Sequence, residues 1–314
     1  MKFILVLIFF LNVFLLSQPS FLGSGTIDDP YQIWTKEHLL ELSDSVNSNN
    51  IYLIYPPGGY GRWCTNKHFC LMQDIDTVTQ SIGWRYFYGH FHSGSNTITV
   101  AIDYDYYSNP NTSSALFASL GMNSSIDSLT IEGYFINGGG IVNSNGGTIF
   151  HCINNANVQS YGIAHYNYNS GTISHCLNNG IVSGVDYIGG IAAVNVGTIS
   201  NCINTGKITG TEFTAGGYNG VGGIVAASGN TISNCINLGD ITGINYISGI
   251  AGSVLGGFYS LSSITNCFNS GYIKGNKYIG GIVGFINDYG NITNCINTGV
   301  VEGEEDVGSI VGKE

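Results

Sequence analysis

An eleven-residue motif recurs six times in the second half of this chain and restricts the fold more than any other feature of the sequence. The first copy is TIFHCINNANV (148–158) and the last is NITNCINTGVV (291–301). A cysteine holds the same place in every copy, and successive cysteines are 24, 26, 33, 32 and 28 residues apart. A second motif, such as YIGGIAA (187–193), lies between copies. This period is typical of a fold in which each repeat stacks on its neighbour.

The repeats favour strands over helices. Each copy has short β-branched runs separated by Gly and Asn, which suit short strands and tight turns. The 3.6-residue apolar period of a helical repeat is absent, and a propeller blade would need about 40 residues. We therefore predict an all-β chain, a parallel β-helix or solenoid of about seven coils, with an N-terminal cap that contains one short α-helix.

Stacking places equivalent residues of successive coils above one another. We expect the Ile three positions before each cysteine, the cysteine itself and the Ile or Val six positions after it to face inward. Because Leu129 takes the cysteine position in the first coil, we expect a column of buried free thiols rather than a disulfide framework. An asparagine follows two positions later and can form a hydrogen-bonded ladder. The predicted ladder residues are Cys152, Cys176, Cys202, Cys235, Cys267 and Cys295, with Asn154, Asn178, Asn204, Asn237, Asn269 and Asn297.

The bulk charge excludes some classes of protein. Only 9% of the residues are charged and the formal net charge is −11. A nucleic-acid-binding protein needs clustered Lys and Arg to neutralise phosphates, so we expect no nucleic acid as a partner.

The first part of the chain divides into a leader and a cap. Residues 1–18 carry Lys2 before an apolar run of the length expected for a secretory signal peptide, the alternative being an uncleaved anchor. We expect a secreted or cell-surface protein with no membrane span in the mature chain. Residues 19–110 form the predicted N-terminal cap region with a helix near 35–47, and 111–314 form the solenoid. Cys64 and Cys70 are predicted to form a disulfide, the alternative being two unpaired thiols.

Several of these segments resemble a known family. GTISNCINTG (197–206) and YIGGIVG (278–284) are similar to the GLUG-motif repeats of secreted and surface proteins of bacteria and protists. GSGTIDDPYQIW (23–34) and LMQDID (71–76) are similar to segments that open many such proteins. The resemblance implies a β-solenoid with a helical cap. It implies no single activity, because these repeats often accompany adhesin or peptidase modules.

Residues that could support chemistry are few. His90 and His92 share a strand face but have no evident third metal ligand. His151 and His175 precede repeat cysteines, where the other four copies have Asn, which favours a polar turn column over a metal site. Two acidic pairs, Asp74 with Asp76 and Asp103 with Asp105, are better explained as solvated strand ends. We therefore predict no catalytic residue, no metal, no cofactor and no enzymatic activity.

A binding role is the remaining prediction. Tyr187, Tyr246 and Tyr278 recur before the second motif and would form an aromatic stripe if they face outward; packing within the strands is the alternative. We predict an adhesin-like module that binds an extracellular glycan or protein. The alternatives are a carbohydrate-active β-helix enzyme and an assembly unit that self-associates through an uncapped C-terminal coil. N-glycosylation sequons begin at Asn111, Asn123 and Asn291.

Overall fold

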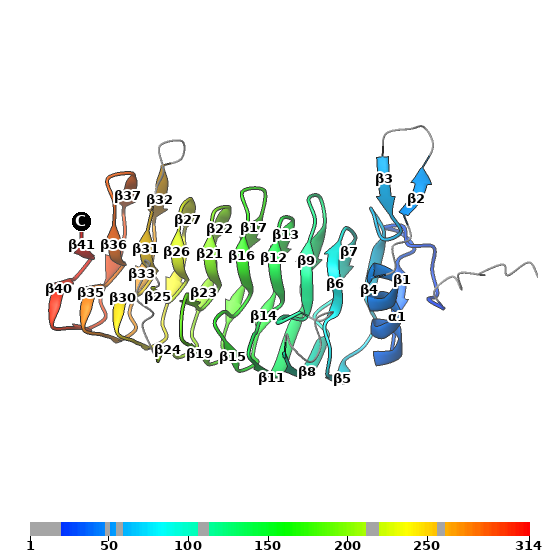
Figure 1. Ribbon diagram of the computed structural model, residues 1–314, viewed down its shortest axis with the longest axis horizontal. Coiled ribbons are helices and arrows are strands. Elements are labelled where there is room, and N and C mark those ends of the chain that lie inside the picture. Colours follow the sequence, from blue (N-terminus) through cyan, green and yellow to red (C-terminus); the bar gives the residue numbers. More distant parts are fainter. Residues whose placement is uncertain (1–19, 48–50, 55–58, 106–112, 212–219, 256–260) are drawn as a thin grey trace, which may run out of the picture.

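The chain forms an elongated parallel β-helix with one helix near its N-terminal end (Figure 1). The computed structural model describes residues 20–47, 51–54, 59–105, 113–211, 220–255 and 261–314. The predicted fold class is therefore confirmed. The predicted signal peptide and the sequon at Asn111 lie outside the described residues.

Five parallel sheets run along the solenoid, and we number them I to V in the order in which a coil passes through them. Sheet I has ten strands: β1 (Tyr31–Ile33), β4 (His68–Leu71), β7 (His90–His92), β10 (Ser125–Asp127), β13 (Thr148–Phe150), β17 (Thr172–Ser174), β22 (Thr198–Ser200), β27 (Thr231–Ser233), β32 (Ser262–Thr265) and β37 (Gly290–Thr293). Sheet II has nine: β5 (Ile75–Val78), β8 (Thr97–Asp103), β11 (Thr130–Ile136), β14 (Ile153–Asn154), β18 (Leu177–Asn178), β23 (Ile203–Asn204), β28 (Ile236–Asn237), β33 (Phe268–Asn269) and β38 (Ile296–Asn297).

The other three sheets complete each coil. Sheet III contains β15 (Val158–Gln159), β19 (Val182–Gly184), β24 (Ile208–Gly210), β29 (Ile241–Thr242), β34 (Ile273–Lys274) and β39 (Val301–Glu302). Sheet IV contains β20 (Ile188–Gly189), β25 (Val221–Gly222), β30 (Asn245–Ser248), β35 (Lys277–Gly280) and β40 (Glu305–Gly308). Sheet V contains β6 (Ile82–Phe87), β9 (Phe117–Leu120), β12 (Val142–Asn145), β16 (Ala164–Asn167), β21 (Ala192–Asn195), β26 (Val225–Ser228), β31 (Ala251–Val254), β36 (Val283–Ile286) and β41 (Val311–Lys313). A separate antiparallel pair joins β2 (Ile51–Ile54) and β3 (Gly59–Arg62).

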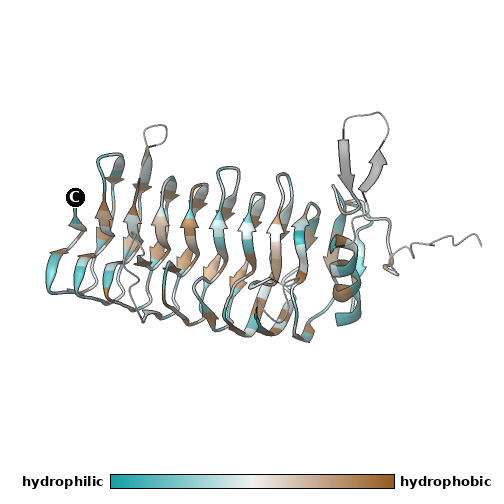
Figure 2. Ribbon diagram, viewed as in Figure 1, coloured by the Kyte–Doolittle hydropathy of each residue, from teal (hydrophilic) through white to brown (hydrophobic). Residues whose placement is uncertain are grey.

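The interior is one continuous apolar column. Ile173, Cys176 and Val182 of one coil are fully or almost fully buried, as are their equivalents in the coils on either side. Figure 2 shows hydrophobic colour recurring at corresponding places in successive coils, whereas hydrophilic colour gathers at β35 and β40. Burial of the same apolar positions in each repeat is the main term that holds the coils together.

Buried asparagines add a polar ladder inside this column. The Nδ2 atom of Asn154 donates to Oδ1 of Asn178 at 2.6 Å, and Asn178 donates to Asn204 at 2.7 Å. The same contact continues to Asn297, and each Nδ2 also donates to the backbone oxygen two residues later. A second ladder, which the sequence reasoning missed, runs through Asn145, Asn167, Asn195 and Ser228. An asparagine two residues before Gly147 and Gly197 is the signal that could have revealed it.

The turn before each repeat cysteine has left-handed backbone geometry. His175 has φ 54° and Asn201 has φ 53°, and the equivalent residues of the other copies are alike. Asn tolerates this region better than most residues, which explains why it dominates the position. The glycine four positions after the cysteine is needed because there is no space for a side chain. A Cβ atom on Gly206 would lie 2.0 Å from the backbone oxygen of Gly180.

The solenoid begins earlier than residue 111. Parallel pairing in sheet I already joins β1 to β4, β4 to β7 and β7 to β10. The solenoid is therefore longer than the seven coils predicted, and much of the predicted cap region belongs to it. The repeat motif is absent there because Phe69 and Phe91 fill the inward position that Ile126 and Ile149 fill in later coils.

The predicted helix is present as α1 (Lys36–Asn47). The backbone N–H of His38 donates to Oγ1 of Thr35 at 3.4 Å, as expected of an N-terminal cap. Leu39, Leu42 and Val46 are buried. The helix packs on β6 and β5, the first strands of sheets V and II, and so covers strand edges that would otherwise be exposed.

The predicted disulfide is not formed. Among the described residues, which include all eight cysteines, no two are joined in a bridge. Cys64 is buried, and its Sγ atom accepts a hydrogen bond from the backbone N–H of Tyr88 at 3.4 Å. Cys70 alternates with buried Phe69 and Leu71 on β4, so its side chain lies on the outer face of sheet I. The two thiols are therefore held in different surroundings.

Candidate functional site

The predicted tyrosine stripe occupies one corner of the solenoid. The pairing of Ile188, Val221, Ile247 and Ile279 in sheet IV aligns the residues that precede them, namely Tyr187, Gly220, Tyr246 and Tyr278. The three tyrosines are half-buried and have φ between 50° and 59°. The three tyrosines therefore do align in one column along the solenoid, but Gly220 takes the place of tyrosine in one coil.

The packing of these rings differs on the two sides of the gap. The ring centroids of Tyr246 and Tyr278 lie 4.7 Å apart, and Phe285 of β36 lies about equally close to both rings, at 6.0 and 6.1 Å. Tyr187 instead packs against the small cluster of Ala115, Tyr161 and Ala193. The tyrosines therefore partly pack against their own coils, as the alternative interpretation supposed, and form two separate aromatic groups.

An outward column on sheet V has a matching gap. The register aligns Tyr166, Val194, Ala227, Ser253 and Phe285 in successive coils. Large rings stand at both ends of this series, and the three side chains between them are smaller. Ala227 belongs to the same coil as Gly220, so this coil has no ring in either column.

A groove of about 470 Å³ lies at this gap. By the register, it extends over Val194 and Ala227, with Tyr166 and Tyr187 toward the N-terminal coils and Leu255 toward the C-terminal coils. Among the described residues, its lining is His165, Tyr166, Tyr187, Val194, Val196, Ala227, Ser228, Gly229 and Leu255. Aromatic walls and a few polar atoms are typical of sites that bind a flat ring or an apolar side chain.

The histidine in the groove is held in place and uncharged. Nδ1 of His165 lies 3.2 Å from Oδ1 of Asn143, and its ring stacks on Tyr161 at 5.1 Å between centroids. Burial lowers the pKa of His165, which keeps its imidazole neutral near pH 7. The hydroxyl of Tyr161 lies 3.0 Å from Oγ of Ser114. The groove therefore offers stacking surfaces and hydrogen-bonding atoms rather than charge.

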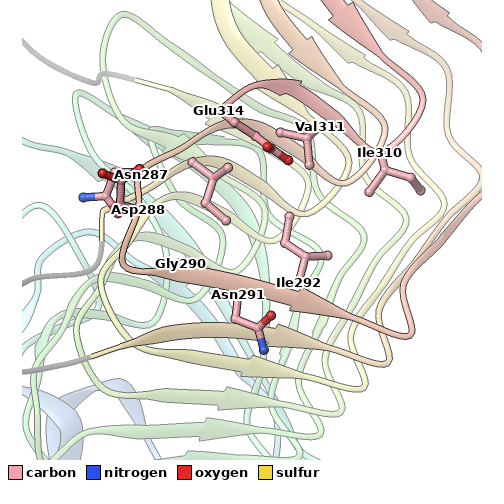
Figure 3. A pocket seen from close by; sticks show the side chains of 9 residues that line it. Asn287, Asp288, Gly290, Asn291, Ile292, Ile310, Val311 and Glu314 are labelled. Atoms are coloured by element: carbon pink, nitrogen blue, oxygen red, sulfur yellow. The ribbon is translucent and has the colours of Figure 1, made fainter.

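A second cavity, of about 430 Å³, opens at the last coil (Figure 3). Figure 3 shows Ile292, Ile310 and Val311 around it, with Asn287, Asp288 and Glu314 at its rim. The strands β37 to β41 are the terminal strands of their sheets, and Ile296, Val300 and Val307 are 58, 61 and 43% exposed. Self-association through this coil stays a prediction.

Outward histidines gather on sheet I. His90 and His92 lie beside His68 of β4, which the sequence reasoning did not connect with them. Within the described residues, no group of three or more His, Cys, Asp or Glu side chains is arranged to hold a metal ion. Asn123 and Asn291, which begin the other two sequons, are exposed.

Comparison with solved structures finds a protein of similar fold. No family model matches the chain, and no curated protein matches it. A crystal structure described as a putative immunoglobulin A1 protease from Bacteroides ovatus has a similar fold, with a TM-score of 0.56 and 17% sequence identity. The likeness covers 92% of this chain and 86% of that one. At this identity it shows the β-helix fold.

This neighbour corrects one prediction. We predicted that the chain is not an enzyme, and the likeness contradicts this because a protein with a similar fold over most of its length carries the name of a protease. An enzymatic role therefore enters the proposals below. None of the helices in the described part of the chain is long and apolar enough to cross a membrane.

Proposed function

We propose that this chain is a secreted or surface-displayed solenoid of the GLUG-repeat type that recognises an extracellular glycan or protein through the groove on sheet V. The groove is the observation that carries the proposal: the coil of Gly220 and Ala227 has no ring in either column, and a space of about 470 Å³ lies there. Extracellular location rests on the leader-like residues 1–18 and on the resemblance of the repeats.

The chemistry of the groove supports a ligand with a flat, weakly charged surface. The apolar face of a sugar ring stacks on tyrosine, and an aromatic side chain of a protein does the same. His165 supplies a hydrogen-bonding ring nitrogen close to these surfaces. Recognition would therefore depend on Tyr166 and Tyr187 together, which stand at the same end of the groove.

Binding of the mature chain to a glycan array and to intact host cells tests this proposal. We expect binding that the double variant Tyr166→Ala/Tyr187→Ala reduces at least tenfold. Tyr134→Ala is the matched control, because Tyr134 is 50% exposed on β11 of sheet II, far from the groove in the coil. Absence of binding on both platforms, or equal loss in the control, contradicts the proposal.

The structural neighbour favours a second candidate function. Because that protein is named for proteolysis of immunoglobulin A1, we also propose that this solenoid takes part in cleavage of an extracellular glycoprotein. Incubation of purified immunoglobulin A1 with the chain, followed by electrophoresis and mass spectrometry of new termini, tests this. Specific new termini that appear in proportion to the chain support the proposal, and intact immunoglobulin after prolonged incubation contradicts it.

A further inference from the structure

Two outward columns of side chains on sheet I contain different residue types in the coils nearest the N-terminus than in the repeats. Register aligns His68 with His90 and Ser125 in one column, and Cys70 with His92 and Asp127 in the other. In most of the repeats Thr and Ser hold these positions, as at Thr172 and Ser174, and Thr198 and Ser200, and none of the repeats has a histidine there. The fold itself therefore does not require an imidazole at these positions.

The three imidazoles form a connected array. Nδ1 of His92 lies 3.4 Å from Oδ2 of Asp127, and Nε2 of His92 lies 3.0 Å from Nδ1 of His68. The rings of His68 and His92 are inclined by only 3° with centroids 5.3 Å apart, which is the separation of two coplanar rings whose nitrogens point at each other. The ring of His90 stacks on His68 at 4.5 Å, and its Nδ1 lies 2.9 Å from Oγ of Ser125.

While both imidazoles are neutral, these contacts set the positions of the protons on His68 and His92. Asp127 can only accept when ionised, so Nδ1 of His92 donates to it and Nε2 of His92 is left as an acceptor. Nδ1 of His68 must then donate to that Nε2 atom. Once His68 and His92 are both protonated, two N–H groups face each other at 3.0 Å and the hydrogen bond between the rings is lost.

Few other charges face the array. On the described strands that pack against it, Asp127 is the one carboxylate and Cys70 the one thiol; the outward residues of β1 and β13 are Gln32, Thr148 and Phe150. Lys67, next to His68, directs its amine to the backbone oxygen of Ser24 at 3.4 Å. Burial, and then the neighbouring imidazoles, lower the pKa of both His68 and His90. One carboxylate therefore faces three groups that can each take a proton.

We propose that the array of His68, His90, His92 and Asp127 is a proton-sensitive joint that holds β4, β7 and β10 together near neutral pH and loosens these coils in mildly acidic surroundings. Protonation of both His68 and His92 breaks the link between them, and protonation of both His68 and His90 places like charges on stacked rings. The coils further along, whose equivalent outward positions carry no histidine, lack this response.

The direction in which stability changes with pH follows from the pKa values of the folded and unfolded states. An unfolded histidine has a pKa of about 6.5, and the folded pKa of His68 and His90 is lower, so the unfolded chain binds protons first as pH falls. Stability from these residues is complete above about pH 6.5 and declines below it. A shift of one pKa unit on one histidine corresponds to about a tenfold change in the opening equilibrium.

Hydrogen exchange of the full chain at pH 7.5 and 5.5, corrected for intrinsic rates, tests the proposal. We expect protection in β4, β7 and β10 to fall about tenfold or more relative to β27, which is the change that one pKa unit on one histidine produces. The variant His68→Thr/His90→Thr/His92→Ser, which installs the residues of the repeats, should abolish this difference. His151→Asn/His175→Asn is the control, because Asn holds those positions in the other copies, and it should respond as the wild type does.

Equal acid sensitivity of the wild type and the triple variant overturns the proposal. If the triple variant does not fold, the imidazole signals of the wild type decide by NMR. Titration of His68 and His90 below about pH 6.5 with mutual coupling supports the joint. Independent titration of both residues at or above that value refutes it.

Discussion

The side-chain Nδ2 atom of Asn204 donates a 2.7 Å hydrogen bond to Oδ1 of Asn237 in the next coil. Asn204 also accepts from Asn178 and donates to the backbone oxygen of Gly206. Each side-chain amide in the ladder therefore makes hydrogen bonds with the amides of both neighbouring coils. These bonds lie inside the apolar column, where a polar group without a hydrogen-bond partner lowers the stability of the fold.

Replacement of Asn204 by Ala should destabilise the chain by about 2–4 kcal/mol, because it leaves polar atoms of Asn178, Asn237 and Gly206 without their partner. Urea unfolding followed by circular dichroism measures the change. Asn179→Ala is the control, because Asn179 is exposed although it bonds to Asn155 at 2.9 Å. It should cost less than about 1 kcal/mol, and equal effects would show that burial of the ladder is unimportant.

Substitution of a repeat glycine should have a larger effect on stability than substitution of a glycine that has open space around it. A Cβ atom on Gly206 would lie 2.0 Å from a backbone oxygen of the preceding coil, so Gly206→Ala should force coils apart and cost more than about 4 kcal/mol. Gly94 has φ 60° and would place a Cβ atom in open space. Gly94→Ala should therefore cost only about 1 kcal/mol, from its backbone conformation alone. Thermal unfolding of both variants tests whether lack of space for a Cβ atom costs more stability than a left-handed backbone conformation does.

The left-handed turn before each cysteine predicts which substitutions His175 tolerates. His175→Asn installs the residue of four other copies and should change stability by less than about 0.5 kcal/mol. His175→Val places a β-branched residue at φ 54° and should cost about 1–2 kcal/mol. If both variants unfold at the same denaturant concentration, the backbone conformation does not explain the preference for Asn.

The repeats could be read from the sequence because each inward position recurs with the same residue type. Register of the coils follows directly when Ile, Cys and Asn return at fixed offsets. The coils that contain Phe69 and Phe91 could not be read this way, since they bury different side chains in the same geometry. A spacing of 22 residues between His68 and His90, close to one coil, was the one clue to their contact.

The groove lies where one coil has no aromatic side chain, and the repeat motifs in the sequence do not indicate such a gap. Gly220 aligns with Tyr187 and Tyr246 only through the pairing of Val221 with Ile188 and Ile247. The long interval of 33 residues between Cys202 and Cys235 obscures that alignment in the sequence. Recurrence of Tyr could therefore suggest a stripe, whereas its interruption required the structure.

Thiol reactivity should distinguish the six buried cysteines from the two that are more accessible. Cys152, Cys176, Cys202, Cys235, Cys267 and Cys64 are at most 2% exposed, whereas Cys70 and Cys295 are partly exposed. Burial raises the pKa of Cys70, and hydrogen bonding to Cys267 raises that of Cys295, so both should react slowly at pH 7 and faster as pH rises. Mass spectrometry after alkylation should find at most two labels on the native chain and eight in denaturant. Fewer than eight in denaturant would reveal a bridge.

Filling the groove provides a test that leaves its tyrosines in place. Ala227→Phe puts a ring at the position that Phe285 holds two coils later, so the solenoid should accept it with little loss of stability. The added ring would occupy the space over β26 and should weaken ligand binding at least tenfold, because the ligand and the new side chain compete for the same surface. Ala227→Ser is the control, since Ser253 holds the same column in the next coil. Affinity measured by calorimetry for any ligand found in the binding screen should fall for Ala227→Phe alone. Unchanged affinity in that variant would place recognition on another part of the outer face.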